Sequence, residues 1–500
     1  MLLTWGMAIL GVLTFVLAFV IQPLLGIGLI FAVGGALCLA WKPIWGTLGY
    51  VFAVGFVAFF NLPITQEGLK LSSVILLCTL AVVFALMIIR RDWTLLRLPF
   101  SRPEHILLLL FWAICFVSMM KSENVGQAIK YLKMFSYPFL AYFLVLFTVK
   151  TVKNFELMVL TAVGAGVAIG LFGLMEINGE SVYVKLGNRS LLGAQLGETI
   201  EKTSMQRING MAADGDLHGG YMGVMCMLTI FIFFKSRSLW LKALFSAAIV
   251  LCFVNVFGAA ARGAVLGFCI MSIVWFIAWD GKLKFAKAAV VGGLAFLIVS
   301  TLVTTTDLHI KRVYSEPRGT AAKTIDLRLN DFLISMNMFT DDPILGKGPA
   351  GYKNEYRDYA YRTSPTARKI LVPDSLNLYT EVLVNTGLIG ASVFTLFLFF
   401  IVKRLLTMVI RLRGSPRALA LSLLAAFSGY SVFVCTSGHL VDQVYWMPVI
   451  FASVFHEIMA PQLYGVKSAA DGDEERADKE SAKVADGPGI VPLPAHPQNN

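Results

Sequence analysis

The sequence predicts an all-helical protein that crosses a membrane many times. Of its 500 residues, 57% are hydrophobic and 15% are charged, whereas a soluble globular domain has about 25% charged residues. The mean hydropathy of +0.72 agrees with this class. Since a spanning helix needs roughly 20 apolar residues, the chain has room for a polytopic transmembrane helix bundle of about 12–14 spans. Soluble parts are then loops and tails, and function must be sought at the membrane faces.

Windows of low charge mark fourteen predicted spans. They lie near residues 2–20, 24–40, 44–61, 71–89, 105–120, 134–149, 156–174, 217–234, 240–258, 261–279, 287–303, 374–402, 418–436 and 440–459. The first window lacks both a preceding basic region and a cleavage motif, which favours a retained span over a removed signal peptide. The seven cysteines lie in apolar stretches without CxxC spacing, so we expect buried thiols rather than disulfides or a zinc site.

The orientation of the bundle follows from the lysines and arginines of the short loops, which favour the cytoplasm. With the N-terminus inside, the cytoplasmic loops hold Lys42, Arg90, Arg91, Arg97, Arg102, Lys150, Lys153, Lys235, Arg237, Lys242, Lys282, Lys284, Lys287, Lys403, Arg404, Arg411, Arg413 and Arg417. The short loops of the opposite side hold only Lys70, Lys121, Lys130, Lys133 and Arg262. The sequence therefore predicts that both termini lie in the cytoplasm.

This topology divides the chain into six parts. They are N-terminal transmembrane helices (1–174), a first periplasmic loop (175–216), central transmembrane helices (217–303), a large periplasmic loop (304–373), C-terminal transmembrane helices (374–460) and a disordered cytoplasmic tail (461–500). The large loop should contain an amphipathic helix lying on the membrane, because its apolar residues recur at helical spacing. These residues are Ile325, Leu329, Phe332, Leu333, Met336 and Phe339.

Arginines gather in the outward segments, against the positive-inside bias. They are Arg189, Arg207, Arg262, Arg312, Arg318, Arg328, Arg357, Arg362 and Arg368. Because a guanidinium can grip phosphate oxygens with two hydrogen bonds, this concentration points to an anionic ligand. Arg262 lies among small residues where helices and a ligand can approach closely, although a membrane anchor is the alternative for this residue and a solvated surface for the loop arginines.

Two further groups are candidates for chemistry. Asn377, Glu381 and Asn385 recur at helical spacing and predict a polar helix face, which either marks a site or bonds neighbouring helices. His439 and Asp442 are three residues apart at an outward turn, where an imidazole could accept a proton. His218, near Asp214 and Asp216, is a similar candidate. For both histidines the commoner role is structural.

Several function classes are excluded by what the sequence lacks. It contains no P-loop, HExxH, GxSxG or convincing dinucleotide motif. Asp214 and Asp216 form a DxD, which is too short a pattern to establish a metal-dependent sugar transferase. The basic residues lie beside a bilayer rather than on a soluble surface interleaved with aromatics, so we expect no nucleic-acid partner.

Motifs in the second half of the chain resemble the family of O-antigen ligases and Wzy-type polysaccharide polymerases. The resemblance rests on Arg328 with Phe332 and Met336, Asp342-Pro343, Gly346-Lys347-Gly348 and Tyr352, then Asn377-Leu378-Tyr379-Thr380-Glu381 and Asn385-Thr386-Gly387-Leu388-Ile389-Gly390. Two shorter stretches, Arg207-Ile208-Asn209-Gly210 and Arg262-Gly263-Ala264, are also similar to elements of that family. The resemblance covers residues 205–440 and is most specific in 323–390.

The resemblance implies a bacterial inner-membrane glycosyltransferase of the GT-C type with its active site facing the periplasm. Such an enzyme takes a glycan from an undecaprenyl diphosphate carrier, without cofactor, nucleotide sugar or metal. On this basis we expect Arg207, Arg262 and Arg328 to hold the diphosphate, with Arg318 in reserve, and a base among Asp374, Glu381 and His439 to activate the acceptor hydroxyl. Partners would be the lipid-linked oligosaccharide, membrane lipid and a chain-length regulator or other polysaccharide-assembly proteins.

One departure from the family pattern affects the choice of reaction. Ligases of the family commonly carry a histidine just before the Asn-x-Tyr element, where this chain has Leu376. This shifts the expectation from ligation toward polymerisation of repeat units for an exopolysaccharide, capsule or O-antigen. The alternatives are an O-antigen ligase or protein O-oligosaccharyltransferase on the same scaffold, and a flippase or transporter for lipid-linked glycans.

Overall fold

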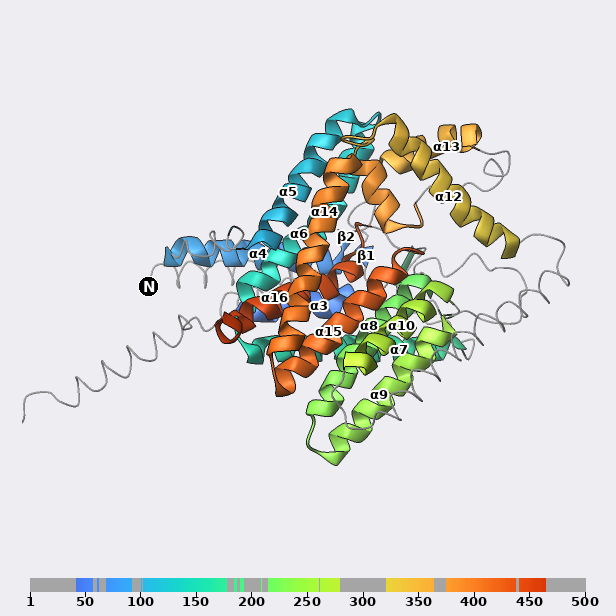
Figure 1. The fold of residues 1–500 in the computed structure, drawn as a ribbon. Coiled ribbons are helices and arrows are strands. Elements are labelled where there is room, and N and C mark those ends of the chain that lie inside the picture. The colour runs from blue at the N-terminus through green and yellow to red at the C-terminus, as the bar shows by residue number, and fades with distance from the viewer. Residues whose placement is uncertain are drawn as a thin grey trace, which may run out of the picture.

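The computed structural model describes residues 42–56, 61–62, 69–91, 100, 102–177, 184–186, 189–192, 208, 215–259, 261–278, 321–363, 375–437 and 440–464. Within these residues the chain is a helical bundle, which confirms the predicted fold class (Figure 1). The exceptions are two short antiparallel hairpins. They pair β1 (Asn61–Leu62) with β2 (Leu69–Lys70), and β3 (Val184–Leu186) with β4 (Arg189–Leu192).

In the described part of the chain, nine helices are long and apolar enough to cross a membrane. They are α4 (Leu71–Arg90), α5 (Pro103–Ser118, extended by the 3-10 turn η2, Met119–Lys121), α6 (Val125–Thr148), α7 (Val152–Ile177), α8 (Gly215–Lys235), α9 (Leu239–Gly258), α14 (Leu378–Arg411), α15 (Gly414–Phe433) and α16 (Gln443–Tyr464). Two shorter apolar helices are α3 (Ile44–Val54) and α10 (Arg262–Ala278). Each overlaps a predicted window, whereas the windows at 2–20, 24–40 and 287–303 lie outside the described residues.

Small residues let α10 approach α15 closely. A Cβ added at Gly267 would lie 2.7 Å from the carbonyl oxygen of Gly429, and a Cβ at Gly263 would overlap the hydroxyl of Thr436. Glycines at such positions allow helix backbones to pack in van der Waals contact within a bilayer. The pairing fixes Arg262, the first residue of α10, beside the last turn of α15.

Helix α14 is broken at Gly387, which has φ 63° and ψ −166°, a conformation open only to glycine. The backbone groups freed by the break bond to the loop 343–348. Val384 and Asn385 accept from the amides of Lys347 and Gly348 at 2.8 and 3.0 Å, while the amides of Leu388 and Ile389 donate to the carbonyls of Pro343 and Ile344 at 2.8 and 3.3 Å. The loop thus satisfies polar groups that could not remain unpaired at membrane depth.

The three polar residues expected on one helix face all precede this break. Asn377 lies before the helix and caps it, because its side chain accepts hydrogen bonds from the amides of Tyr379 and Thr380. Glu381 and Asn385 occupy the short segment between this cap and Gly387. Glu381 and Asn385, four residues apart, share one buried face of this first segment, and Asn377 is its cap.

Helices α12 (Ala321–Asp341) and α13 (Gly351–Thr363) lie against the end of the bundle at which α14 begins (Figure 1). Ile334 and Met338 of α12 are buried against tyrosines of α13 and against Val384. A helix thus lies in the segment predicted as the large loop, while its periplasmic side and its position on the membrane surface stay predictions. Leu329, Phe332 and Leu333 are exposed on α12, so the apolar side foreseen in the sequence is left uncovered.

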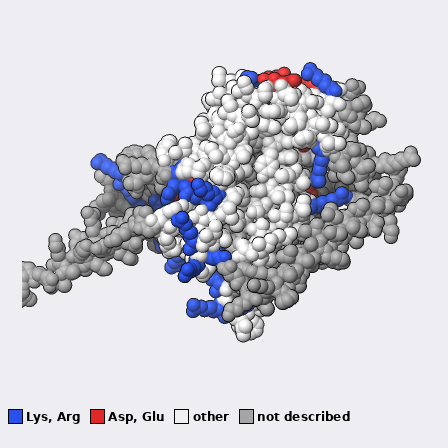
Figure 2. All heavy atoms as spheres, viewed as in Figure 1, with Lys and Arg blue, Asp and Glu red and all other residues white. Residues whose placement is uncertain are grey.

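The bundle has two unlike ends. We call the end that carries α12, α13 and the start of α14 the loop face, and the end that carries Arg90, Arg404 and the start of α7 the basic face. Figure 2 shows Lys and Arg side chains gathered at the left and lower left of the view, and a broad area without charge across the centre. The charge distribution agrees with a bundle whose uncharged middle faces lipid.

Candidate functional site

Two of the predicted diphosphate-binding arginines come together at the loop face. Arg262 is the first residue of α10, and Arg328 is in α12, which is distant in sequence. The positive charge of Arg328 acts electrostatically on Arg262, so the two side chains lie in the same part of the molecule. Two like charges repel one another, so their approach raises the free energy of the protein unless an anion lies between them.

Neither arginine has an acidic partner within the described residues. The ion pairs of this part of the chain engage other side chains, and the Nε of Arg328 is buried without a hydrogen-bond partner. A buried guanidinium N–H without an acceptor costs free energy that a bound oxyanion would recover. The pair therefore has the electrostatics of an anion site.

Asp331 ties the segment that carries Arg328 to the start of α14. Its Oδ2 accepts from the amide of Leu376 at 3.2 Å, and its Oδ1 accepts from the hydroxyl of Tyr352 in α13. Arg328 lies one helical turn before Asp331, on the same side of α12. This network therefore holds Arg328 in place relative to the Leu376–Asn377 lead-in.

Glu381 is buried, 5% exposed, and both of its oxygens are engaged. Oε1 accepts from the hydroxyl of Tyr131 in α6, and Oε2 accepts from the amide of Leu440 at 3.1 Å. The carbonyl of Leu440 in turn accepts from the indole of Trp446 at 2.9 Å. Glu381 thus holds the residue that follows His439, and each of its two oxygens already accepts a structural hydrogen bond.

Four predicted site residues, Arg207, Arg318, Asp374 and His439, lie outside the described residues. Two of them adjoin residues whose positions are fixed. Ile208, which follows Arg207, donates its amide to the carbonyl of Gly258 at 3.1 Å and is 1% exposed. Leu440, which follows His439, is held by Glu381.

His218 belongs to the interior of the bundle. It is 0% exposed, and its Nε2 lies 3.0 Å from Oδ1 of Asn255, whose amide nitrogen donates to the carbonyls of Gly170 and Leu251. This arrangement joins α7, α8 and α9. The structural alternative for His218 is therefore the better one.

Lys347, in the Gly-Lys-Gly motif, also has a structural role. Its ammonium pairs with Asp342 at 2.7 Å and with Glu355 at 3.2 Å, and Asp342 additionally pairs with Lys121 at 3.1 Å. Burial opposes ionisation of Asp342, but hydrogen bonds from Lys347 and Lys121 outweigh it and lower the pKa of this carboxyl group. The cluster fastens the loop that fills the break in α14.

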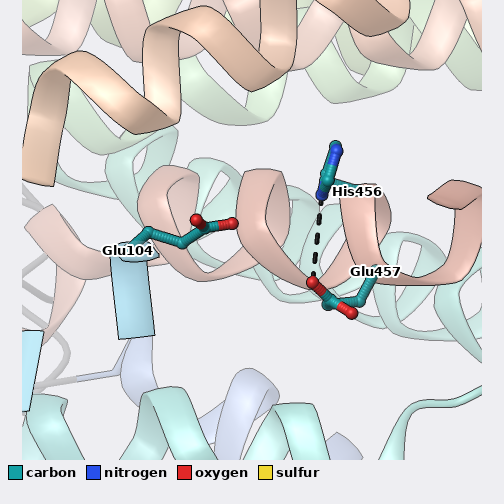
Figure 3. A group of neighbouring side chains, drawn as sticks. All are labelled: Glu104, His456 and Glu457. Atoms are coloured by element: carbon teal, nitrogen blue, oxygen red, sulfur yellow. Dashed lines mark ion pairs between the residues drawn. The ribbon is translucent and has the colours of Figure 1, made fainter. Parts of the chain in front are cut away.

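A second polar cluster lies at the basic face. Donor atoms of Glu104, His456 and Glu457 are within 4.8 Å of one another, a spacing compatible with a metal ion (Figure 3). Arginines already occupy this cluster, however. Arg404 donates to Nε2 of His456 at 3.1 Å and to Glu104 at 3.3 Å, and Arg102 donates to Glu457 at 2.8 Å.

The hydrogen bond from Arg404 decides how this cluster works. Since Nε2 of His456 accepts from a guanidinium, the proton of the neutral imidazole is on Nδ1, the atom 3.9 Å from Glu457. A protonated nitrogen cannot ligate a metal. We interpret the cluster as an ion-pair network that ties α5, α14 and α16 together.

Sequence reasoning gave no structural role to Tyr131, Asp331 or Tyr352, although Tyr352 belongs to a motif named above. Each makes its contact across a long separation in the chain, such as the 250 residues between Tyr131 and Glu381. Asp331 had a local signal, because an acidic residue on a face buried by neighbouring helices needs hydrogen-bond donors. Tyr131 had none, since a tyrosine in a membrane helix is ordinary.

Comparison with known proteins gives a match in the region that contains Arg262 and Arg328. A family model described as O-antigen ligase matches residues 247–395, a segment that includes Arg262, Arg328 and Glu381. A search of curated proteins found no match. The matched segment contains the two arginines that converge and the broken start of α14. Residues 247–395 of this multi-pass membrane protein are thus similar to the O-antigen ligase family, the resemblance that the sequence motifs indicate.

Proposed function

We propose that the protein is a Wzy-like polymerase that joins oligosaccharide repeats carried on undecaprenyl diphosphate, at the periplasmic face of the bacterial inner membrane. The observation that carries the proposal is the convergence of Arg262 and Arg328 without an acidic partner in the described residues. A lipid-linked diphosphate is an anion presented at the membrane surface. Two guanidinium groups suit it because each can bind two phosphate oxygens.

In the proposed reaction, the acceptor hydroxyl attacks the anomeric carbon of the donor sugar. The bond from this carbon to the diphosphate oxygen breaks, and the leaving diphosphate gains negative charge. Arg262 and Arg328 stabilise that charge, with Arg207 and Arg318 as further candidates, while a base takes the proton of the hydroxyl. The products are an extended glycan and the lipid diphosphate.

We assign Glu381 a positioning role and leave the base to Asp374 or His439. The two oxygens of Glu381 accept hydrogen bonds from Tyr131 and Leu440. A carboxylate used in this way is a poor proton acceptor. It would act by fixing the turn at His439.

The polymerase proposal is preferred to ligation because of Leu376. The family's ligases commonly have a histidine there, whereas here the Leu376 backbone amide is used to bind Asp331. A transporter hypothesis would be favoured by a broken helix whose unpaired backbone groups could bind a substrate. The break at Gly387 supports that alternative little, because the backbone of the loop 343–348 fills it.

The test is to delete the gene in its host and to complement with wild type, Arg262→Ala or Arg413→Ala. Arg413 is an exposed arginine of the basic face and serves as the matched control. A polymerase predicts single repeats on the lipid carrier in the deletion and Arg262→Ala strains, and long polymer in the other two. Intact polymer without its acceptor would indicate a ligase, and lipid-linked repeats trapped on the inner leaflet would indicate a flippase.

A further inference from the structure

A hollow at the basic face has no part in the proposed reaction. We call it the basic pocket; it lies among α3, α4, α6 and α7 and has a cavity volume of about 430 Å³. Its polar lining is formed by Lys42, Arg90, Thr148, Lys150 and Asn154. A hydrogen bond of 2.7 Å between Thr47 and Thr148 joins α3 and α6 beside it. The pocket is therefore built on packed helices.

The pocket is strongly positive. Three bases line it, and no acidic residue is among the lining side chains. Two helices begin here, α3 and α7, and two end here, α4 and α6, so their backbone dipoles largely offset one another. The charge of the pocket is thus set by its side chains, and they select an anion.

The remaining walls are apolar, which points to an amphiphilic ligand. Ile44, Val83, Met87 and Phe147 line the same hollow as the bases. A free inorganic anion would gain nothing from these surfaces. Basic pockets between transmembrane helices on the cytoplasmic side are typical sites for the headgroups of anionic lipids.

A long apolar groove adjoins the basic pocket. It runs between α7, α8 and α9, has a volume of about 1250 Å³, and shares Asn154 with the pocket. Gly164 lines the groove, and a Cβ added to it would meet no atom within 4 Å. From Asn154 to Gly164 the helix rises about 15 Å, which is half of the roughly 30 Å hydrocarbon thickness. An acyl chain of one leaflet fits that length.

We propose that the basic pocket binds the phosphate headgroup of an anionic phospholipid of the adjoining leaflet, and that the groove holds one of its acyl chains. This site is at the end of the bundle opposite to Arg262 and Arg328, and it does not depend on the proposed function. The headgroup would contact Lys42 just before α3, Arg90 at the end of α4 and Lys150 just before α7. The site should bind phosphatidylglycerol more tightly than a zwitterionic phospholipid with the same acyl chains.

The experiment uses full-length protein, freed of lipid in detergent, and measures binding of phosphatidylglycerol and phosphatidylcholine by native mass spectrometry. Each base near an anionic headgroup contributes about 1 kcal/mol, or roughly a fivefold change in affinity. Arg90→Gln/Lys150→Gln should therefore weaken phosphatidylglycerol binding by about 25-fold. Binding of phosphatidylcholine should not change, and neither should that of either lipid to Arg413→Gln.

Gly164→Leu tests the groove separately. The new side chain should weaken binding of a long-chain phosphatidylglycerol and leave a short-chain analogue unaffected, while the elution volume of the protein stays that of wild type. The proposal is overturned if phosphatidylcholine binds as tightly as phosphatidylglycerol, or if the double variant binds like wild type. Displacement of the lipid by millimolar inorganic phosphate would also overturn it, because the pocket would then be a site for soluble anions.

Discussion

Arginines at the two ends of this bundle are used in opposite ways. At the basic face, Arg102 and Arg404 bond to Glu457 and Glu104, so the positive charges are neutralised by the protein itself. At the loop face, Arg262 and Arg328 approach one another without an acid in the described residues. An arginine bonded to an acid has its charge balanced within the protein, whereas two neighbouring arginines without an acid are available to an anionic ligand. The presence or absence of an acidic partner thus distinguishes structural arginines from candidate ligand-binding arginines.

The largest effect should come from breaking the paired end. Arg404→Ala would leave Glu104, which is 1% exposed, as a buried charge without its partner. Loss of one member of a buried pair costs on the order of 3–5 kcal/mol. Thermal unfolding in detergent should show this loss, and the activity of each folded molecule should not change. Glu104→Gln/Arg404→Met should recover much of the stability, since it removes both charges; failure to recover would contradict the ion-pair account.

At the loop face, replacing Arg262 or Arg328 should reduce activity without lowering stability. Arg262→Ala or Arg328→Ala should lower glycan transfer by roughly 100- to 1,000-fold, the loss expected when one group that stabilises developing charge is removed. The unfolding temperature should stay near that of wild type or rise, because repulsion between the two guanidinium groups is relieved. An assay of polymer formation with purified protein gives the first quantity. A marked drop in stability without loss of transfer would show that the pair is structural.

A smaller effect separates positioning from proton transfer at Glu381. Glu381→Gln keeps the shape but leaves one oxygen for two donors, and Tyr131→Phe removes one donor. A positioning role predicts that both variants lose activity by a similar factor, about 10-fold, as expected for one buried hydrogen bond. Initial rates across pH 6–9 are the measurement. If Glu381→Gln abolished transfer while Tyr131→Phe was silent, Glu381 would be the base.

The smallest effect is expected at an exposed pair of the loop face. Lys121→Gln removes the partially exposed contact with Asp342 and should cost less than about 1 kcal/mol. The pKa of Asp342 is lowered in the folded protein, so its ion pairs stabilise above the unfolded-state pKa and are lost as pH falls through the folded-state pKa. The difference between variant and wild type in thermal unfolding should therefore vanish in acid. A difference that grew in acid would contradict this sign.

Much of the fold was predictable because the physical signal is local. Long apolar windows indicate spans without any knowledge of contacts, whereas the orientation inferred from the loop charges stays a prediction. The break in α14 was not predictable in the same way. Gly387 in an apolar window looks like an ordinary small residue, and only the exchange of hydrogen bonds with the loop 343–348 shows why the helix stops there.

The candidate site divides along the same line. Arg262 stood out because a charge among small apolar residues is expensive in a membrane. Its proximity to Arg328 depends on where the fold places α10 and α12, which no sequence spacing gives. Glu381 was selected for the right reason, its cost in a membrane helix, but its partners Tyr131 and Leu440 come from other helices and change its role.

Binding of the lipid diphosphate itself tests the central claim most directly. Purified protein should bind undecaprenyl diphosphate more tightly than undecaprenyl monophosphate, and Arg262→Gln/Arg328→Gln should remove that preference while Arg413→Gln retains it. Equal affinity of wild type for the two lipids, or an unchanged preference in the double variant, would contradict the account that these two arginines hold a diphosphate.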